Sequence, residues 1–361
     1  MRVALVTAGF PPRVGGVERV CAALADGLAE AGDDVTVVTF GRGDTRDHGY
    51  PVLRVRSFGD VFELAPNLVR TLRSLDVDVI SAHNLHATAP IGAWLARTVP
   101  YVLTGHYHGD GHSAAARLAH PLYRPVANRV VRDAAAVTAV SVAEADLVEA
   151  HFGVRPVVIP NGVAAGAPGP RVPDPDGRAK VVVVARLLPY KRVDAALEAL
   201  AALPWRWTMD VVGDGPDRSR LERLAAGHGL AGRVRFHGGG LDDRAVGALV
   251  RDADVLLNMS EAEAFSLVVL EALAAGTPVV VNGGSGLRAW AERYPGAVVA
   301  ATGTGEVAGA VASLEGTRPQ VDLREHAWPG VVARYREVMA RAAGVSLPAT
   351  PEADRAMARD R

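Results

Sequence analysis

The stretch DVLLNMSEAEAFSLVVLEALAAGTPVVVNGG, residues 254–284, decides the fold. Its apolar run 254–260 predicts a strand, and a second apolar run predicts another strand at 279–284. Between them, Ser266 is a residue type that caps helices, and it precedes a predicted helix over 267–275. A strand, a helix and a strand in this order form the crossover unit of a parallel sheet.

The same alternation extends over most of the chain. Short Val- and Ile-rich runs, typical of strands covered on both faces, alternate with amphipathic helical runs. The predicted strands are 3–8, 35–40, 52–56, 78–83, 101–106, 136–141, 156–161, 181–186, 208–215 and 234–238, besides the two above. We therefore expect an α/β fold with two tandem Rossmann-like domains, whose parallel sheets face each other across a cleft.

The domain boundaries follow from composition. A stretch rich in Pro, Gly and Ala breaks the alternation and predicts a linker at 165–179, between domains at 1–164 and 180–326. Residues 346–361 are polar, contain two prolines and predict a flexible tail.

The composition excludes several classes of protein. A net charge of −1 gives no general basic field for nucleic acid. The single cysteine, Cys21, excludes an internal disulfide and a cysteine zinc site, and we expect it to face the core. No charge-free apolar run of about 20 residues is present, and the N-terminal apolar run is too short for a signal peptide. We expect a cytoplasmic protein.

Contact with the inner face of the membrane is left open by one segment. Residues 112–133 mix arginines with apolar residues, a pattern that a surface touching anionic lipid would show, although a solvated face is the favoured interpretation. Pro121 and Pro125 are expected to break any long helix there.

Two glutamates accompany the helix of the opening stretch. Glu263 lies in the loop before it and Glu271 in its second turn. A helix start suits a phosphate, and a carboxylate can accept two hydrogen bonds from a vicinal diol such as ribose, so the pattern fits a nucleotide sugar. The alternative is a solvated loop acid and a surface helix residue.

Arg186 ends the strand predicted at 181–186, and Lys191 follows in the loop before the next helix. Arg186 and Lys191 together would clamp a diphosphate, although two ordinary surface cations would look the same. Short Asp-x-Asp pairs, which could hold a divalent cation, are interpreted as structural. They are Asp76/Asp78, Asp174/Asp176 and Asp252/Asp254. Without a metal site, the cations and the helix start must carry the diphosphate charge.

The first domain offers glycines and histidines. Gly15 and Gly16, between the first strand and helix, let the backbone approach a ligand or another segment closely. His106 and His83 end strands, where a histidine can donate to a sugar hydroxyl or carry a proton, and we single out His106. The remaining histidines of this region are interpreted as loop residues rather than zinc ligands: His86, His108 and His112.

The motifs occur in an order that resembles a known family. They are GGVER (15–19), GHYHG (105–109), IPNGV (159–163), ARLLPYK (185–191), VVGDGP (211–216), VRFHGG (234–239) and EAFSLVVLEALAAGTPVV (263–280). Together they resemble the retaining, GT-B-fold glycosyltransferases of family four, also called glycosyltransferase group 1. The last motif matches the family's element of two glutamates eight residues apart.

The resemblance implies a role for each residue at the donor site. Glu271 would bind the donor ribose, Glu263 the sugar hydroxyls, and Arg186 and Lys191 the diphosphate. Backbone N–H groups would come from Phe265, Ser266 and Leu267.

The remaining implied roles lie elsewhere in the chain. Gly15, Gly16 and Gly213 would bind the donor through close backbone approach, and His106 would contact the sugar near its anomeric carbon. The resemblance counts His106, Arg186, Lys191 and Glu263 as catalytic, and it implies no metal and no cofactor. A terminal helix at 327–345, around Trp328, would cross back onto the first domain.

The function implied is retaining transfer of a hexose-type sugar from a UDP- or GDP-sugar to an acceptor hydroxyl. The acceptor is left open between a small metabolite or natural product and a lipid-linked or polysaccharide chain. A nucleotide-sugar epimerase and a binding-only protein are the alternatives. Ser266 and Ala264 stand where the family usually has glycine, which leaves the donor sugar open.

Overall fold

The computed structural model of the 361-residue chain describes residues 1–41, 48–59, 63–109, 114–163 and 171–347. Four of the sequence predictions lie wholly or partly outside these ranges. They concern the loop position of His112, the arginine-containing segment 112–133, the linker at 165–179 and the tail at 346–361.

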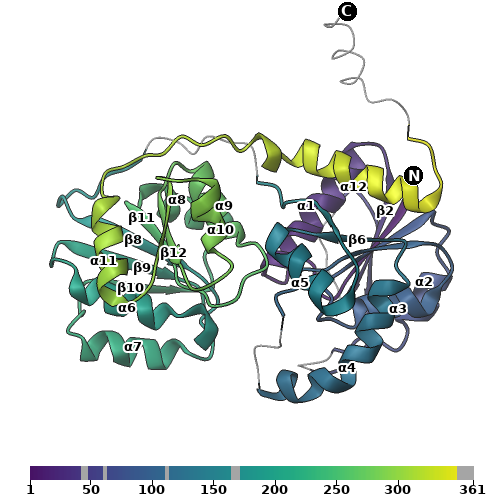
Figure 1. Cartoon of the computed structure of the whole chain (residues 1–361), viewed down its shortest axis with the longest axis horizontal. Coiled ribbons are helices and arrows are strands. Elements are labelled where there is room, and N and C mark those ends of the chain that lie inside the picture. Colours follow the sequence, from purple (N-terminus) through teal and green to yellow (C-terminus); the bar gives the residue numbers. More distant parts are fainter. Residues whose placement is uncertain (42–47, 60–62, 110–113, 164–170, 348–361) are drawn as a thin grey trace, which may run out of the picture. The chain divides into compact units, whose positions relative to one another are not determined.

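The chain folds into two compact units (Figure 1). Unit 1 consists of Met1–Gly162 together with the chain from Trp328 onward, and unit 2 is the continuous stretch Val163–Ala327. The chain therefore leaves unit 1 once and returns to it near its end.

Unit 1 contains a seven-stranded sheet in which all strands are parallel, in the order β3-β2-β1-β4-β5-β6-β7. The reversal of strand order beside β1 is the hallmark of a doubly wound Rossmann-like sheet. The strands are β1 (Arg2–Thr7), β2 (Asp34–Phe40), β3 (Val52–Val55), β4 (Val79–His83), β5 (Tyr101–Thr104), β6 (Ala136–Ala139) and β7 (Val157–Val158).

Helices cover both faces of this sheet, because alternate strand residues bury in opposite directions. Val3 and Leu5 of β1 pack into one core, whereas Ala4 and Val6 pack into another. The helices are α1 (Gly16–Glu30), α2 (Leu68–Arg73), α3 (Ala89–Ala96), α4 (Ala114–Arg132), α5 (Val142–Phe152) and α12 (Trp328–Ala343). Cys21 of α1 is fully buried in the first core, as predicted.

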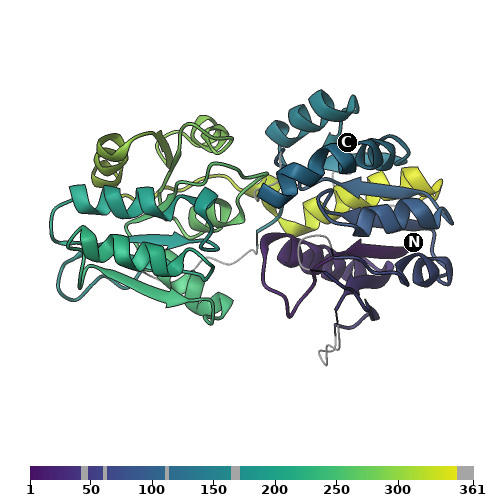
Figure 2. The same cartoon turned by 90° about the horizontal axis from the view of Figure 1, so that it is seen from below.

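The terminal helix α12 packs beside α1 on unit 1, and both views show it there (Figures 1 and 2). Gly27 of α1 makes close approach possible, since a Cβ at that position would lie 2.5 Å from Cγ2 of Val332. Arg336 of α12 forms a buried ion pair with Asp33, with 2.7 Å between Nε and Oδ2. The helix is thus an integral part of the first unit.

One prediction about unit 1 is wrong. Helix α4 runs without interruption over Ala114–Arg132 and includes both Pro121 and Pro125, which we expected to break it. Each proline removes only one intrahelical hydrogen bond. The C-terminal half of the helix is held by tertiary packing, because Ala127 and Val130 are buried in the core of unit 1.

Unit 2 contains a six-stranded parallel sheet in the order β10-β9-β8-β11-β12-β13. Its strands are β8 (Ala179–Val184), β9 (Trp207–Val212), β10 (Val234–Gly238), β11 (Val255–Asn258), β12 (Val279–Asn282) and β13 (Val298–Ala301). Its helices are α6 (Val193–Ala202), α7 (Arg218–Gly227), α8 (Asp243–Asp252), α9 (Leu267–Ala274), α10 (Arg288–Arg293) and α11 (Thr304–Ser313), with short 3₁₀ helices η1 (Pro189–Lys191) and η2 (Arg324–His326).

The βαβ unit of the opening stretch is β11-α9-β12, and its two strands are parallel neighbours as predicted. Strand β13 was not among the sequence predictions. In the described part of the chain, no helix is long and apolar enough to span a bilayer.

Candidate functional site

The loop after β11 reaches α9 through a residue in an unusual backbone conformation. Ser266 has φ of 76°, a left-handed value that is uncommon for residues other than glycine. Its side chain does not cap α9 as predicted. Instead its Oγ accepts a hydrogen bond of 2.9 Å from Nδ2 of Asn258, the last residue of β11, and this bond holds the loop in place.

The residue before it, Phe265, is held from the other side. Its carbonyl oxygen accepts a hydrogen bond of 2.7 Å from Nε1 of Trp290, and its ring packs edge-on against the indole at 5.0 Å. The ring of His326 also packs against the Phe265 ring, with 5.7 Å between the ring centroids. Leu267 then begins α9, so Phe265, Ser266 and Leu267 place backbone N–H groups where an anion can bind.

The structure brings together two of the predicted residues, Lys191 and Glu263. Nζ of Lys191, in η1, lies 2.6 Å from Oε1 of Glu263, in the loop before α9. Both side chains are largely buried, with 14% and 18% exposure. An ion pair that is shielded from water is stronger than an exposed one, so this contact fixes the loop of Glu263 against the loop that follows β8.

Arg186 lies in the same loop but two residues beyond the end of β8, rather than inside the strand as predicted. Its side chain is exposed, and Nη2 lies 3.4 Å from the hydroxyl of Tyr190. It forms no ion pair with any residue that the structure describes, which leaves its charge available to a ligand.

Gly213 permits the close approach of the segments that follow β8 and β9. Its φ is 127°, and a Cβ there would lie 1.9 Å from the carbonyl oxygen of Ala185. No other residue fits without displacing the backbone next to Arg186. The structure thus gives Gly213 a steric role, and the predicted contact of this glycine with the donor stays a prediction.

Glu271 lies in the second turn of α9 and is partly exposed, whereas Val269, Leu270, Ala272 and Leu273 are buried. The apolar run around it covers the core, and the glutamate points away from that face. Its carboxylate consequently does not bear the cost of full burial.

In unit 1, Gly15 precedes α1 and Gly16 begins it. A Cβ at Gly15 would lie 2.1 Å from Oε2 of Glu18, and one at Gly9 would lie 2.2 Å from its Oε1. Because Gly9 and Gly15 have no side chains, the carboxylate of Glu18 can lie close to the backbone before α1. Glu18 belongs to the GGVER motif (15–19), but the sequence prediction gave it no role of its own, and it did not include Gly9.

His106 lies two residues beyond the end of β5, in a left-handed conformation with φ of 47°, and not at the strand end as predicted. Its Nε2 lies 3.3 Å from Nδ1 of His83, whose Nε2 lies 3.0 Å from Oγ of Ser81. Burial lowers the pKa of His106 from 6.5 to about 4 and that of His83 well below its usual value. Both rings are therefore neutral at pH 7.

Glu144 is a functional candidate that the sequence prediction missed. It is 2% exposed, and its carboxylate accepts hydrogen bonds from the backbone N–H groups of Tyr107 and Val140, each 2.7 Å long. Burial raises its pKa from 4.5 to about 7. The spacing Ser-x-x-Glu would have indicated it, because Ser141 caps α5 by accepting from the N–H of Glu144.

Three further histidines of unit 1, His86, His108 and His151, gather around Tyr107. The ring of His86 stacks on His108 at 4.3 Å and on Tyr107 at 5.0 Å, and the Tyr107 hydroxyl lies 2.8 Å from Nδ1 of His151. Within the ranges that the structure describes, no group of three or more His, Cys, Asp or Glu side chains could hold a metal ion.

The Asp-x-Asp pairs hold neighbouring backbone and arginine groups. Asp78 accepts from the backbone and side chain of Arg2, and Asp254 accepts from Arg171 and from the N–H of Lys180. These contacts tie strand starts to adjacent segments, which is the structural role expected of them.

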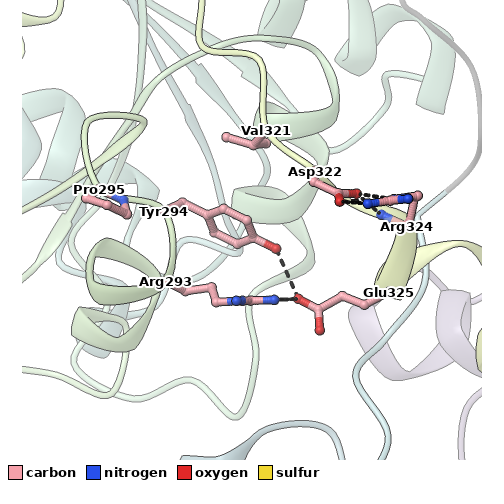
Figure 3. Close-up of a pocket in the computed structure, with 7 residues that line it drawn as sticks. All are labelled: Arg293, Tyr294, Pro295, Val321, Asp322, Arg324 and Glu325. Atoms are coloured by element: carbon pink, nitrogen blue, oxygen red, sulfur yellow. Dashed lines mark hydrogen bonds and ion pairs between the residues drawn. The ribbon is translucent and has the colours of Figure 1, made fainter.

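Unit 2 also has a surface depression of about 590 Å³ (Figure 3). Arg293 and Tyr294 both contact Oε1 of Glu325 there, at 2.8 and 3.3 Å, and Asp322 pairs with Arg324. The charged side chains that line it are thus engaged with one another. None of the predicted site residues lines this depression.

Comparison with known proteins defines the class. The sequence profile of Glycosyltransferase Family 4 matches residues 14–166, and that of Glycosyl transferases group 1 matches residues 170–326. The GDP-mannose-dependent alpha-mannosyltransferase of Mycolicibacterium smegmatis is 30% identical over 315 residues, which cover 80% of this chain and 81% of that protein. A glycogen synthase of Mycobacterium tuberculosis is 30% identical over 337 residues, covering 80% and 79%.

Solved structures show the same fold. Sucrose-phosphate synthase from Thermosynechococcus elongatus superimposes with a TM-score of 0.72 at 20% identity, over 94% of both chains. Anabaena HepE in complex with UDP-glucose gives 0.69 at 21% identity, over 95% of this chain and 98% of that one. The fold is GT-B, as predicted. The chain belongs to glycosyltransferase family 4, the group 1 glycosyltransferases.

Proposed function

We propose that this glycosyltransferase moves a hexose-type sugar, with retention of anomeric configuration, from a UDP- or GDP-linked donor to an acceptor hydroxyl. The contact of 2.6 Å between Lys191 and Glu263 carries the proposal. It supports the proposal because a cation that would hold phosphate and a carboxylate that would bind sugar hydroxyls lie side by side near the start of α9. Unit 2 would thus bind the donor and unit 1 the acceptor.

The diphosphate would be held without a metal ion. Arg186 and Lys191 supply two positive charges, and the backbone N–H groups of Phe265, Ser266 and Leu267 supply hydrogen bonds at a helix start. The same groups would stabilise the negative charge that develops as the phosphate leaves.

The nucleoside would be recognised mainly by Glu271, whose carboxylate would accept hydrogen bonds from both ribose hydroxyls. Gly15 and Gly16 would let the backbone before α1 approach the phosphates. GDP-mannose dependence of the Mycolicibacterium relative and UDP-glucose bound to HepE support these two donor bases.

In the proposed reaction, the acceptor oxygen bonds to the anomeric carbon on the face from which the phosphate leaves. The bond from that carbon to the phosphate oxygen breaks, and this oxygen takes the acceptor's proton. His106 would contact the sugar near the anomeric carbon as a neutral hydrogen-bonding group, since burial lowers its pKa to about 4.

A panel of UDP- and GDP-sugars tests the proposal by thermal shift, followed by turnover of the stabilising donor in labelled form. Ligands that bind the folded state raise its melting temperature by mass action. We expect a labelled acceptor with the donor's anomeric configuration. Formation of an epimerised nucleotide sugar would instead identify an epimerase. Binding with no turnover in the presence of acceptors would instead identify a binding-only protein.

Replacing Glu271 by alanine tests the ribose contact. Loss of charged hydrogen bonds is worth about 1.5–3 kcal/mol each, so loss of both ribose contacts should lower donor affinity roughly 100-fold or more. Glu271 is only partly buried, so the variant should keep its fold. Glu292→Ala, an exposed position on α10, is the matched control. Unchanged donor affinity in Glu271→Ala would contradict the assignment.

A further inference from the structure

Three polar side chains form a continuous chain from the interior of the unit 1 sheet to His106. Ser81 and His83 both belong to β4 and are fully buried. Oγ of Ser81 lies 3.0 Å from Nε2 of His83, and Nδ1 of His83 lies 3.3 Å from Nε2 of His106. His106, at 6% exposure, is the outermost member.

The direction of these hydrogen bonds depends on where the two imidazole protons lie. A neutral imidazole has one N–H donor and one acceptor nitrogen. Both rings are neutral at pH 7, because burial lowers their pKa values. Two arrangements are therefore conceivable: every bond points outward from Ser81 to His106, or every bond points inward.

The hydroxyl of Ser81 decides between the two directions. Among the residues that the structure describes, His83 is its hydrogen-bonding partner, and the side chain is sealed from water. If Nε2 of His83 donated to Ser81, the hydroxyl proton of the serine would be buried without an acceptor, which is disfavoured. The outward direction satisfies it: Ser81 donates to Nε2 of His83, and Nδ1–H of His83 donates to Nε2 of His106.

The surroundings keep these rings in place. Tyr335 of α12, itself fully buried, packs its ring 6.4 Å from that of His83. The backbone on either side of His106 is fixed by hydrogen bonds from Gly105 N–H to the carbonyl of Thr138, at 3.1 Å, and from Tyr107 N–H to Glu144. The backbone that carries His106 and the ring of His83 are therefore both held in place.

We propose that Ser81 and His83 are positioning residues which hold His106 in its Nδ1–H tautomer, so that it presents a hydrogen-bond donor to the donor sugar. The tautomer follows from the buried hydrogen bonds of Ser81, His83 and His106 alone, whereas its use in catalysis rests on the proposed function. A neutral ring with a fixed proton binds a hydroxyl oxygen without first rearranging.

The test is nitrogen NMR of the full-length protein labelled with ¹⁵N-histidine at pH 7, with the His106 signals assigned through His106→Gln. We expect the proton of His106 on Nδ1 in the natural protein. Ser81→Ala removes the hydroxyl group that donates a hydrogen bond to His83, so His106 should show both tautomers. His83→Asn keeps an amide donor facing His106 and should preserve the Nδ1–H tautomer, even when combined with Ser81→Ala.

Kinetics supply the second readout. With the sugar donor, kcat/KM of Ser81→Ala should fall about 10-fold, the effect of one weakened hydrogen bond. Affinity for the free nucleoside diphosphate, which lacks the sugar, should stay within about 2-fold. Ser74→Ala, which removes an exposed hydroxyl after α2, is the control.

A proton on Nε2 of His106 in the natural protein, or an unaltered tautomer in Ser81→Ala, would overturn the inference. A changed tautomer with unchanged kcat/KM would overturn the link to the sugar alone. Failure of the proposed function has a different signature, because a protein that transfers no sugar would still give the tautomer result. If Ser81→Ala does not fold, the two His83 variants test the inference instead. His83→Leu should lose the Nδ1–H tautomer of His106 and His83→Asn should keep it; the same tautomer in both variants would overturn the inference.

Discussion

Replacing Glu144 by glutamine should change how the stability of the protein depends on pH. The carboxyl group is 2% exposed and accepts N–H groups from Tyr107 and Val140. Burial raises its pKa from 4.5 to about 7. Because one pKa unit corresponds to about 1.4 kcal/mol, keeping this carboxylate charged in the folded protein costs about 3 kcal/mol.

The sign follows from proton binding. Between pH 4.5 and 7 the folded state binds this proton more tightly than the unfolded chain, so the contribution of Glu144 to stability falls as the pH rises. His106 acts in the opposite direction: its pKa is lowered to about 4, so its contribution is lost as the pH falls from 6.5 towards 4. In the natural protein the two contributions partly cancel.

The Glu144→Gln variant removes only the first contribution. Its amide accepts one of the two backbone N–H groups but not both, so we expect a loss of about 1–3 kcal/mol at pH 4.5. That deficit should shrink by up to about 3 kcal/mol as the pH rises to 7. Urea unfolding followed by circular dichroism measures both values.

Glu149→Gln is the control, since it makes the same chemical change at an exposed position of the same helix, α5. It should differ little from the natural protein at any pH in this range. A deficit of Glu144→Gln that stays constant from pH 4.5 to 7 would refute the argument that the buried carboxyl binds a proton.

Two further substitutions test the packing of each unit. Asp33→Asn leaves Arg336 of α12 as a buried cation without its charged partner, so the free energy of unfolding should fall by about 3–5 kcal/mol. Urea unfolding measures this loss, and a loss below about 1 kcal/mol would show that the ion pair is dispensable. Gly213→Ala forces a Cβ to within 1.9 Å of the carbonyl oxygen of Ala185, so it should destabilise unit 2 by more than about 1 kcal/mol and weaken nucleotide binding. Gly305→Ala in α11, where a Cβ meets open space, should instead stabilise the protein by about 0.5–1 kcal/mol. Equal melting temperatures for these two glycine variants would contradict the steric argument for Gly213.

Periodicity predicted the parts of the fold that depend on local pattern. The strand-helix-strand unit at 254–284 is present as Val255–Asn258, Leu267–Ala274 and Val279–Asn282. The predicted strands extend too far, because an apolar run does not reveal where backbone pairing stops. His106 and Arg186 are examples, since each lies two residues past the end of its strand.

The errors arise where distant residues decide the local structure. Ser266 is a good capping residue by composition, but its hydroxyl accepts from Asn258 on the preceding strand. The prolines of α4 disfavour a helix by propensity, yet the helix continues because its later turns pack into the core. Neither outcome can be read from a window of neighbouring residues.

The resemblance named candidate site residues but not the contacts between them. The resemblance identified Lys191 and Glu263 separately, and only the structure shows that their charged atoms lie 2.6 Å apart. Ser81 could not have been found, because a serine in an apolar strand gives no signal until its distance to His83 is known.

The return of α12 to unit 1 has a consequence for the order in which the protein can fold during synthesis. Val331, Val332, Tyr335 and Met339 complete a core that begins at β1. A ribosome makes these residues only after the whole of Val163–Ala327, which is continuous and can fold first. The first half of the chain must therefore wait, with one face of its sheet incompletely covered, until the last helix emerges.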